Sequence, residues 1–163
     1  IKTGIVEIIT DPDAAEIYVD GVKAEKLSNT SLELVEGKHL IALYLQKTNY
    51  NHSFVVDVKD GQQETIKIAL RGNLEVETYT QKPSQTPAIL DVYIDSRHVG
   101  KSPLSLTDIV AGTHNLKVIT EGVAKERQIE IRPASPLLVR YKIIREPAPV
   151  NKKDEKGVDD VTF

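Results

Sequence analysis

The sequence predicts an all-β protein made of two tandem small β-sandwich domains with mostly antiparallel strands. Short segments that alternate apolar and polar residues run through most of the 163 residues, separated by turns rich in Gly, Pro, Asn and Asp. The pattern also occurs twice, because Asp20 and His39 lie 75 positions before Asp95 and His114. Repetition at such an interval indicates two copies of one folding unit.

The first copy is predicted to form about six short strands, and no segment of it convincingly indicates a helix. Pro12 ends the first strand because proline cannot donate to a β-ladder, and Asp20-Gly21 is a tight-turn signal after the second. Residues 22–30 are polar, and we expect them to be irregular. The predicted strands cover Gly4–Thr10, Ala15–Asp20, Ser31–Val35, His39–Leu45, Phe54–Val58 and Ile66–Leu70.

The second copy begins at Gly72 and repeats this order. The offset between the copies grows by seven residues after the first strand, and the extra residues fall in Gln81–Pro87, a polar loop that can absorb an insertion. We therefore predict one domain over residues 1–71, a second over 72–144, and a polar linker or tail over 145–163. Core candidates are the positions that stay apolar in both copies, which in the second are Leu74, Val76, Val92, Ile94, Leu116, Val118, Ile129, Ile131, Val139, Tyr141 and Ile143.

Composition excludes several classes of function. A net charge of -3 provides no basic field for nucleic acid, so we expect no nucleic-acid partner. The absence of Cys removes disulfides, thiolate nucleophiles and zinc–thiolate sites. The longest apolar run, Leu40–Leu45, is far shorter than the ~20 residues of a spanning helix, so we expect no direct membrane insertion.

The polar motifs do not assemble into a catalytic or metal site. Gly100-Lys101-Ser102 lacks the preceding Gly of a phosphate loop, since that position is Asp95. The aspartates lack the alternating oxygen ligands of a calcium loop, and no Ser is spaced with a His and an acid as a triad. We predict no enzyme activity, no catalytic residue, no metal and no cofactor. The serines weighed for a triad are Ser28, Ser31, Ser102 and Ser105.

The four histidines point to structural roles. His39 and His114 stand at the same place in the two copies, which favours a repeated packing or hydrogen-bonding role over metal ligation. We place His52 and His98 in turns, where the sequence reveals no partner for either.

Tyr18 and Tyr93 are the candidate ligand-binding residues. Each copy places a Tyr on the strand face opposite its core residues, where an aromatic ring can stack on a sugar or anchor a protein partner. The alternative is that Tyr simply suits a pleated strand. Strand edges are a second route to partners, including self-association.

Several segments of the chain resemble the PEGA domain family, and together they cover about residues 4–144. In the first copy these segments are Pro12-Asp13-Ala14-Ala15, Ile17-Tyr18-Val19-Asp20-Gly21 and Gly37-Lys38-His39. In the second they are Val92-Tyr93-Ile94-Asp95, Gly100-Lys101-Ser102-Pro103 and Gly112-Thr113-His114.

The resemblance implies a tandem PEGA protein built from small β-sandwiches related in form to transthyretin-like and carboxypeptidase-regulatory domains. It also implies a prokaryotic, extracytoplasmic location in the periplasm or at the cell surface, in a family not known as a catalytic unit. We therefore expect a non-catalytic structural or protein-interaction module of a bacterial or archaeal envelope or surface assembly, with an envelope or surface protein as its partner. The alternative is a module that binds cell-wall or surface glycan.

Overall fold

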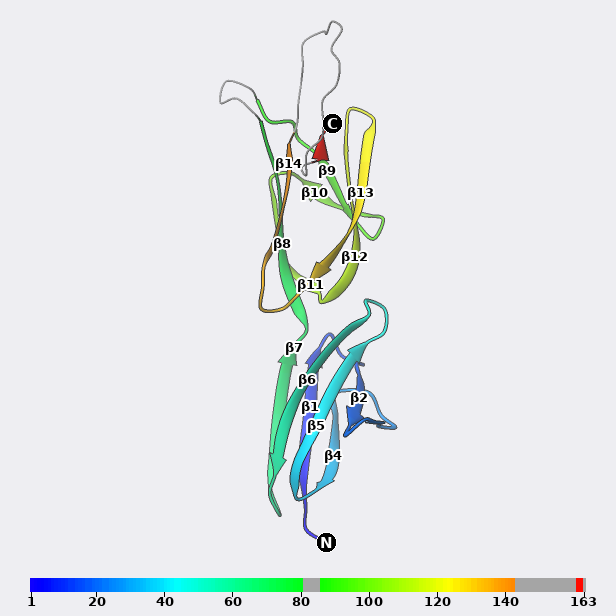
Figure 1. The fold of residues 1–163 in the computed structure, drawn as a ribbon, viewed down its shortest axis with the longest axis vertical. Coiled ribbons are helices and arrows are strands. Elements are labelled where there is room, and N and C mark those ends of the chain that lie inside the picture. The colour runs from blue at the N-terminus through cyan, green and yellow to red at the C-terminus, as the bar shows by residue number, and fades with distance from the viewer. Residues whose placement is uncertain (81–85, 143–160, 163) are drawn as a thin grey trace, which may run out of the picture. The chain divides into compact units, whose positions relative to one another are not determined.

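The computed structural model describes residues 1–80, 86–142 and 161–162, and these residues form strands and turns without any helix. The predicted all-β fold class is therefore confirmed. The chain divides into two compact units, Ile1–Gly72 with Val110–Thr113, and Asn73–Ile109 with His114–Phe163. Figure 1 shows the strands of each unit.

The first unit places two sheets face to face. One sheet has the order β4-β1-β7, and the other has the order β3-β2-β5-β6. β1 pairs antiparallel with β4 but parallel with β7, whereas the second sheet is antiparallel throughout. The strands are β1 (Thr3–Asp11), β2 (Glu16–Val19), β3 (Val22–Lys23), β4 (Thr30–Val35), β5 (Gly37–Leu45), β6 (Tyr50–Val58) and β7 (Gln63–Ala69).

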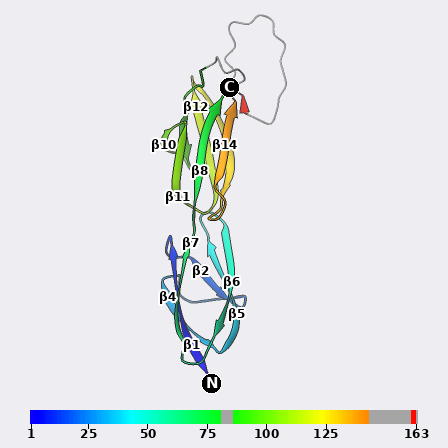
Figure 2. The same cartoon turned by 90° about the vertical axis from the view of Figure 1, so that its left-hand side faces the viewer.

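The second unit repeats this arrangement. Its sheets have the orders β11-β8-β14-β15 and β10-β9-β12-β13, and β8 runs parallel to β14 as β1 does to β7 (Figure 2). Only β15 lacks a counterpart among the described strands of the first unit. The strands are β8 (Arg71–Tyr79), β9 (Asp91–Ile94), β10 (Arg97–Lys101), β11 (Leu104–Val110), β12 (Gly112–Thr120), β13 (Val123–Ile131), β14 (Leu137–Lys142) and β15 (Val161–Thr162).

Each unit has its own apolar core, formed by every second residue along its strands, because successive side chains of a strand point to opposite faces of the sheet. The side chains of Ile17 and Ile41 are fully buried in the first unit, and those of Val92 and Leu116 are fully buried in the second. The predicted core positions from Leu74 through Tyr141 all lie in the second cluster, which confirms the strand alternation there. Ile143 lies outside the described residues.

Three expectations differ from the structure or fall outside it. The predicted irregular stretch 22–30 contains β3, because Val22–Lys23 folds back against β2 across the Asp20-Gly21 turn. The insertion loop lies outside the described residues at 81–85. The predicted tail is likewise outside them except for Val161–Thr162, which pairs in parallel with β14.

Candidate functional site

The outer face of the β3-β2-β5-β6 sheet presents apolar and aromatic side chains to solvent. Cross-strand register places Leu40 opposite Val55, and Ala42 between Tyr18 and Ser53. Leu40 is 50% exposed and Val55 is 63% exposed. We call this surface the Tyr18 face and define it by Tyr18, Leu40, Ala42, Tyr44 and Val55. Residues directly opposite each other on one face lie close enough to act as a unit.

The two tyrosines of the Tyr18 face are held by local hydrogen bonds. The Tyr18 hydroxyl donates to the Glu16 carboxylate at 3.0 Å, and the Tyr44 hydroxyl donates to Asn49 Oδ1 at 3.0 Å. The hydrogen bond to Glu16 is the main reason that the pKa of Tyr18 is raised. Both half-buried rings are therefore fixed in place with their hydroxyl protons already committed, which leaves their apolar surfaces for contact with a partner.

Charges of both signs surround this apolar centre. Lys23 lies 3.7 Å from Glu16 next to Tyr18, and Lys38 lies opposite Asp57 in the row beyond Leu40. The Lys23 side chain is 55% exposed, and Lys38 and Asp57 are exposed, so water screens these charges and they contribute little to folding stability. An apolar centre with a charged rim is the usual anatomy of a protein–protein contact surface.

Tyr93 occupies the equivalent place in the second unit but has different neighbours. The Lys117 ammonium lies 5.1 Å from the centre of its ring, and the His98 ring packs against it edge-on with centroids 5.0 Å apart. Asp91 accepts a hydrogen bond from Lys101 at 2.8 Å and is 3.2 Å from His98, and these contacts lower the pKa of Asp91, Lys101 first. The Tyr93 ring thus belongs to a polar cluster and is partly covered.

The two predicted site residues are therefore not equivalent in surroundings. Where the first unit has Leu40 and Ala42, the 75-residue offset gives Asn115 and Lys117 in the second. Sequence reasoning selected Tyr18 but missed the aliphatic pair beside it. A signal for Leu40 was available in the sequence, because Leu40 alternates with the buried residues of its strand and the matching position of the second unit is the polar Asn115. The pairing of Leu40 with Val55, in contrast, can be known only from the strand register.

His39 and His114 make the same contact in both units, which agrees with the repeated hydrogen-bonding role. Each histidine Nδ1 lies 2.6 Å from a carboxylate oxygen of the aspartate 19 residues earlier, Asp20 or Asp95. The other oxygen of that carboxylate accepts the backbone N–H of the residue after the histidine at 2.8 Å. The aspartate thereby connects the turn after β2 to strand β5 in the first unit, and the turn after β9 to strand β12 in the second.

The expectation for His52 and His98 was wrong, because both lie in strands with partners. His98 is part of β10 and contacts Asp91 and Tyr93. His52 is part of β6, and its ring lies 5.9 Å from that of Phe54. Strand pairing brings these residues together, and the sequence around each histidine does not reveal it.

Ser28 and Ser102 form a second repeated contact, which the sequence did not predict. The Ala15 N–H donates to Ser28 Oγ at 2.8 Å, and the Ser28 N–H donates to the Ala15 carbonyl at 2.8 Å. In the second unit Leu90 and Ser102 exchange the same two bonds at 2.8 and 2.9 Å. Both serines are buried, so they serve as backbone bridges inside the units.

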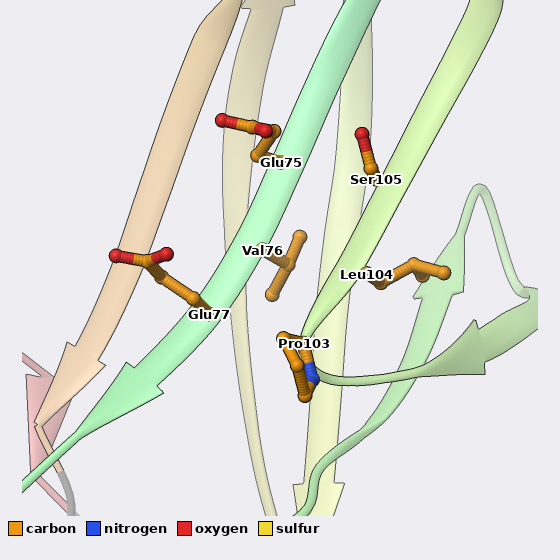
Figure 3. A pocket seen from close by; sticks show the side chains of 6 residues that line it. All are labelled: Glu75, Val76, Glu77, Pro103, Leu104 and Ser105. Atoms are coloured by element: carbon orange, nitrogen blue, oxygen red, sulfur yellow. The ribbon is translucent and has the colours of Figure 1, made fainter.

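A shallow groove in the second unit lies between β8 and β11, with a volume of about 160 Å³. Figure 3 shows the Glu75 and Glu77 carboxylates extending from β8 away from Ser105, so the polar groups do not converge. Glu77 is also paired with Arg140 at 3.0 Å. Since ligand pockets usually enclose roughly 300–1,000 Å³, this groove does not fit a small-molecule site. Its lining residues are Glu75, Val76, Glu77, Pro103, Leu104 and Ser105.

Neither a metal cluster nor a spanning helix is found in the part of the chain that the structure describes. Among residues 1–80, 86–142 and 161–162, no three His, Cys, Asp or Glu side chains are grouped so that they could hold a metal ion. These residues likewise form no helix that is long and apolar enough to cross a membrane.

Comparison with known protein families finds a match for one part of the chain. Residues 86–145 match the PEGA domain, a family of extracellular or periplasmic-type modules. The family resemblance is thereby confirmed for this part of the chain. A search of curated proteins found no match.

Proposed function

We propose that this chain is a tandem pair of PEGA-like sandwiches that acts as a non-catalytic protein-interaction module in an extracytoplasmic assembly of a prokaryotic envelope or surface. The tandem arrangement is supported by the common strand pairing of the two units and by their repeated Asp–His and Ser contacts. The family match of the second unit supports the extracytoplasmic location. Fractionation of cells that express the full-length protein tests that location.

The observation that carries the proposal is the aliphatic pair Leu40 and Val55 on the Tyr18 face. Two large apolar side chains that are at least half exposed, placed in register and next to fixed tyrosines, cost free energy in water unless a partner covers them. The partner is expected to be a protein with an apolar centre and charges on its rim, matching the Lys38 and Asp57 row.

A pair of photo-crosslinking positions tests this function. Ser53 lies in the middle of the Tyr18 face, opposite Ala42, and Glu126 is its match in the second unit by the offset of 73. A crosslinking amino acid at Ser53 is expected to capture a defined envelope protein from source cells, whereas the same residue at Glu126 does not. Equal capture at both positions, or none at Ser53, contradicts the proposal.

The double variant Leu40→Asn with Val55→Gln gives the matching affinity test. It installs the residues found at the aligned positions of the second unit, Asn115 and Gln128, so both side chains are compatible with this fold. Removing a pair of apolar anchors costs about 1–3 kcal/mol of binding, or about 5- to 150-fold in Kd for the crosslinked partner. Unchanged affinity with a folded variant refutes the Tyr18 face as the contact surface.

A glycan partner is the second candidate, favoured by the pair of tyrosines on one sheet face. Tyr18 and Tyr44 offer ring surfaces for sugar stacking, although their hydroxyls already donate to Glu16 and Asn49. Peptidoglycan sedimentation and glycan arrays distinguish the two functions. Saccharide-dependent binding that Tyr18→Ala abolishes and Tyr93→Ala preserves identifies a glycan module and overturns the protein-partner proposal.

Strand edges offer the proposed module a route to self-association. The edge of β14 pairs with β15 in parallel, and β7 holds the same position in its own sheet. An edge strand presents backbone groups that another chain can pair with. Sedimentation velocity over a concentration series is expected to detect dimers, and a concentration-independent monomer contradicts this route.

A further inference from the structure

We infer that His39 is a doubly protonated imidazolium in the folded protein and forms a pH-sensitive brace at one end of the first unit. The geometry of its two ring nitrogens leads to this conclusion. Nδ1 lies 2.6 Å from Asp20 Oδ2, and Nε2 lies 2.6 Å from the Val35 carbonyl oxygen. A carbonyl can only accept, and an ionised carboxylate can only accept, so both nitrogens must donate. A neutral imidazole has one N–H and would direct a lone pair at one of these oxygens.

A neutral imidazole facing a protonated Asp20 is excluded by the surroundings of the carboxyl group. The Asp20 side chain is 51% exposed to water, and its Oδ1 accepts the Leu40 N–H at 2.8 Å. Its hydrogen bonds, first to His39 and then to Leu40, lower the pKa of Asp20. The carboxylate is therefore the charged partner, and the His39 ring, whose side chain is 16% exposed, carries the balancing positive charge.

The negative charge that contacts the His39 ring is the Asp20 carboxylate. The Val35 carbonyl, followed by the Asp20 carboxylate, raises the pKa of His39 against a smaller opposing effect of burial. Its cross-strand neighbour on β6 is the apolar Val56. Lys2 and Glu36 near this end are exposed, and the Glu36 N–H donates to the Lys2 carbonyl. Lys38 points to the other side of the sheet, as does Asp57, whose carboxylate lies 3.2 Å from the exposed Lys59 ammonium.

The brace joins three segments that are separate in sequence. His39 on β5 connects the β2–β3 turn through Asp20 with the end of β4 through Val35. The Asp20 backbone is also tied to β5, because its N–H donates to the Leu40 carbonyl at 2.8 Å. Loss of the imidazolium proton removes one of the two His39 donors, so either Val35 in the β4–β5 corner or Asp20 in the β2–β3 turn loses its hydrogen bond to His39.

The pH dependence follows from the direction of the shifts. Because the pKa of His39 is raised on folding, its contribution is complete below the unfolded value of about 6.5 and is lost as pH rises through the folded pKa. The pKa of Asp20 is lowered, so its contribution is complete above about 3.9 and is lost as pH falls through the folded pKa. The brace is therefore complete between about pH 3.9 and about pH 6.5. Starting from neutral pH, it is lost when the pH rises and His39 gives up its second ring proton.

Ring-nitrogen NMR of the full chain tests the inference directly. Long-range ¹H–¹⁵N correlation at pH 6.5 is expected to show both His39 nitrogens protonated, with a titration midpoint above that of the same histidine in the urea-unfolded chain. A neutral tautomer with one unprotonated nitrogen, or a midpoint at or below the unfolded one, overturns the inference.

A matched pair of variants separates the brace from general folding effects. Asp20→Asn keeps an oxygen for the Leu40 N–H but removes the negative charge, so the His39 midpoint is expected to fall. Asp95→Asn makes the same change in the second unit and is expected to leave the His39 midpoint unchanged. Equal shifts in both variants, or none in Asp20→Asn, contradict the assigned partner.

Discussion

The buried hydroxyl of Ser28 gives the sharpest prediction for stability. Ser28 is 7% exposed, and Ser28→Ala removes its hydroxyl oxygen without adding any atom. That oxygen accepts the N–H of Ala15, which is fully buried, and contacts Thr10 Oγ1 at 2.6 Å. Since Thr10 Oγ1 donates to the Pro12 carbonyl, the Ser28 hydroxyl must donate to Thr10.

The expected loss is about 1.5–4.5 kcal/mol of unfolding free energy for the first unit. A buried N–H left without an acceptor costs about 1–3 kcal/mol, and a lost neutral hydrogen bond costs about 0.5–1.5 kcal/mol. Ser102→Ala removes only the bond to the Leu90 N–H, so the second unit is expected to lose about 1–3 kcal/mol. Ser53→Ala on the exposed Tyr18 face is the control, with a change within about 0.5 kcal/mol.

Urea unfolding followed by hydrogen exchange mass spectrometry measures these losses unit by unit. Peptides of the first unit are expected to lose protection at lower urea in Ser28→Ala, and peptides of the second unit in Ser102→Ala. A Ser28→Ala variant as stable as Ser53→Ala would show that water replaces the bridge and would refute the reasoning.

Three further predictions concern the core, a close contact and a surface charge. Ile17→Ala is expected to cost about 2–5 kcal/mol in urea unfolding because the side chain is fully buried, whereas Val22→Ala at a 70% exposed position stays within about 0.5 kcal/mol. Gly4→Ala is expected to cost about 1–3 kcal/mol or more by overpacking, because the new Cβ would lie 2.6 Å from a backbone carbonyl oxygen; wild-type stability would contradict this. Lys101→Met is expected to raise the pKa of Asp91, which carboxylate NMR titration measures, and an unchanged midpoint would exclude the lysine as its main partner.

Local pattern predicted the all-β class and most of the strands. Alternation has a period of two in a strand, so it assigns Ile17 and Ile41 to the inside and Leu40 to the outside without knowledge of any partner strand. The equal spacing of the aspartate and histidine in both copies also pointed to one repeated role, which the hydrogen bonds now define.

Partners across strands could not be predicted in this way. The parallel pairing of β1 with β7, the small strand β3 and the Asp91 cluster around His98 depend on chain segments that meet only after folding. The register between two strands is fixed by the burial of one whole sheet face, and that burial depends on residues far apart in the sequence.

The sequence by itself determined that this protein is built of pleated strands, and it singled out Tyr18 and Tyr93 as outward rings. Tertiary structure alone decided that the two rings differ, with aliphatic Leu40 and Val55 near Tyr18 and the Lys117 ammonium over Tyr93. The physical reason is that a strand's own residues decide which side chains face outward, whereas the neighbours of each side chain are supplied by other strands.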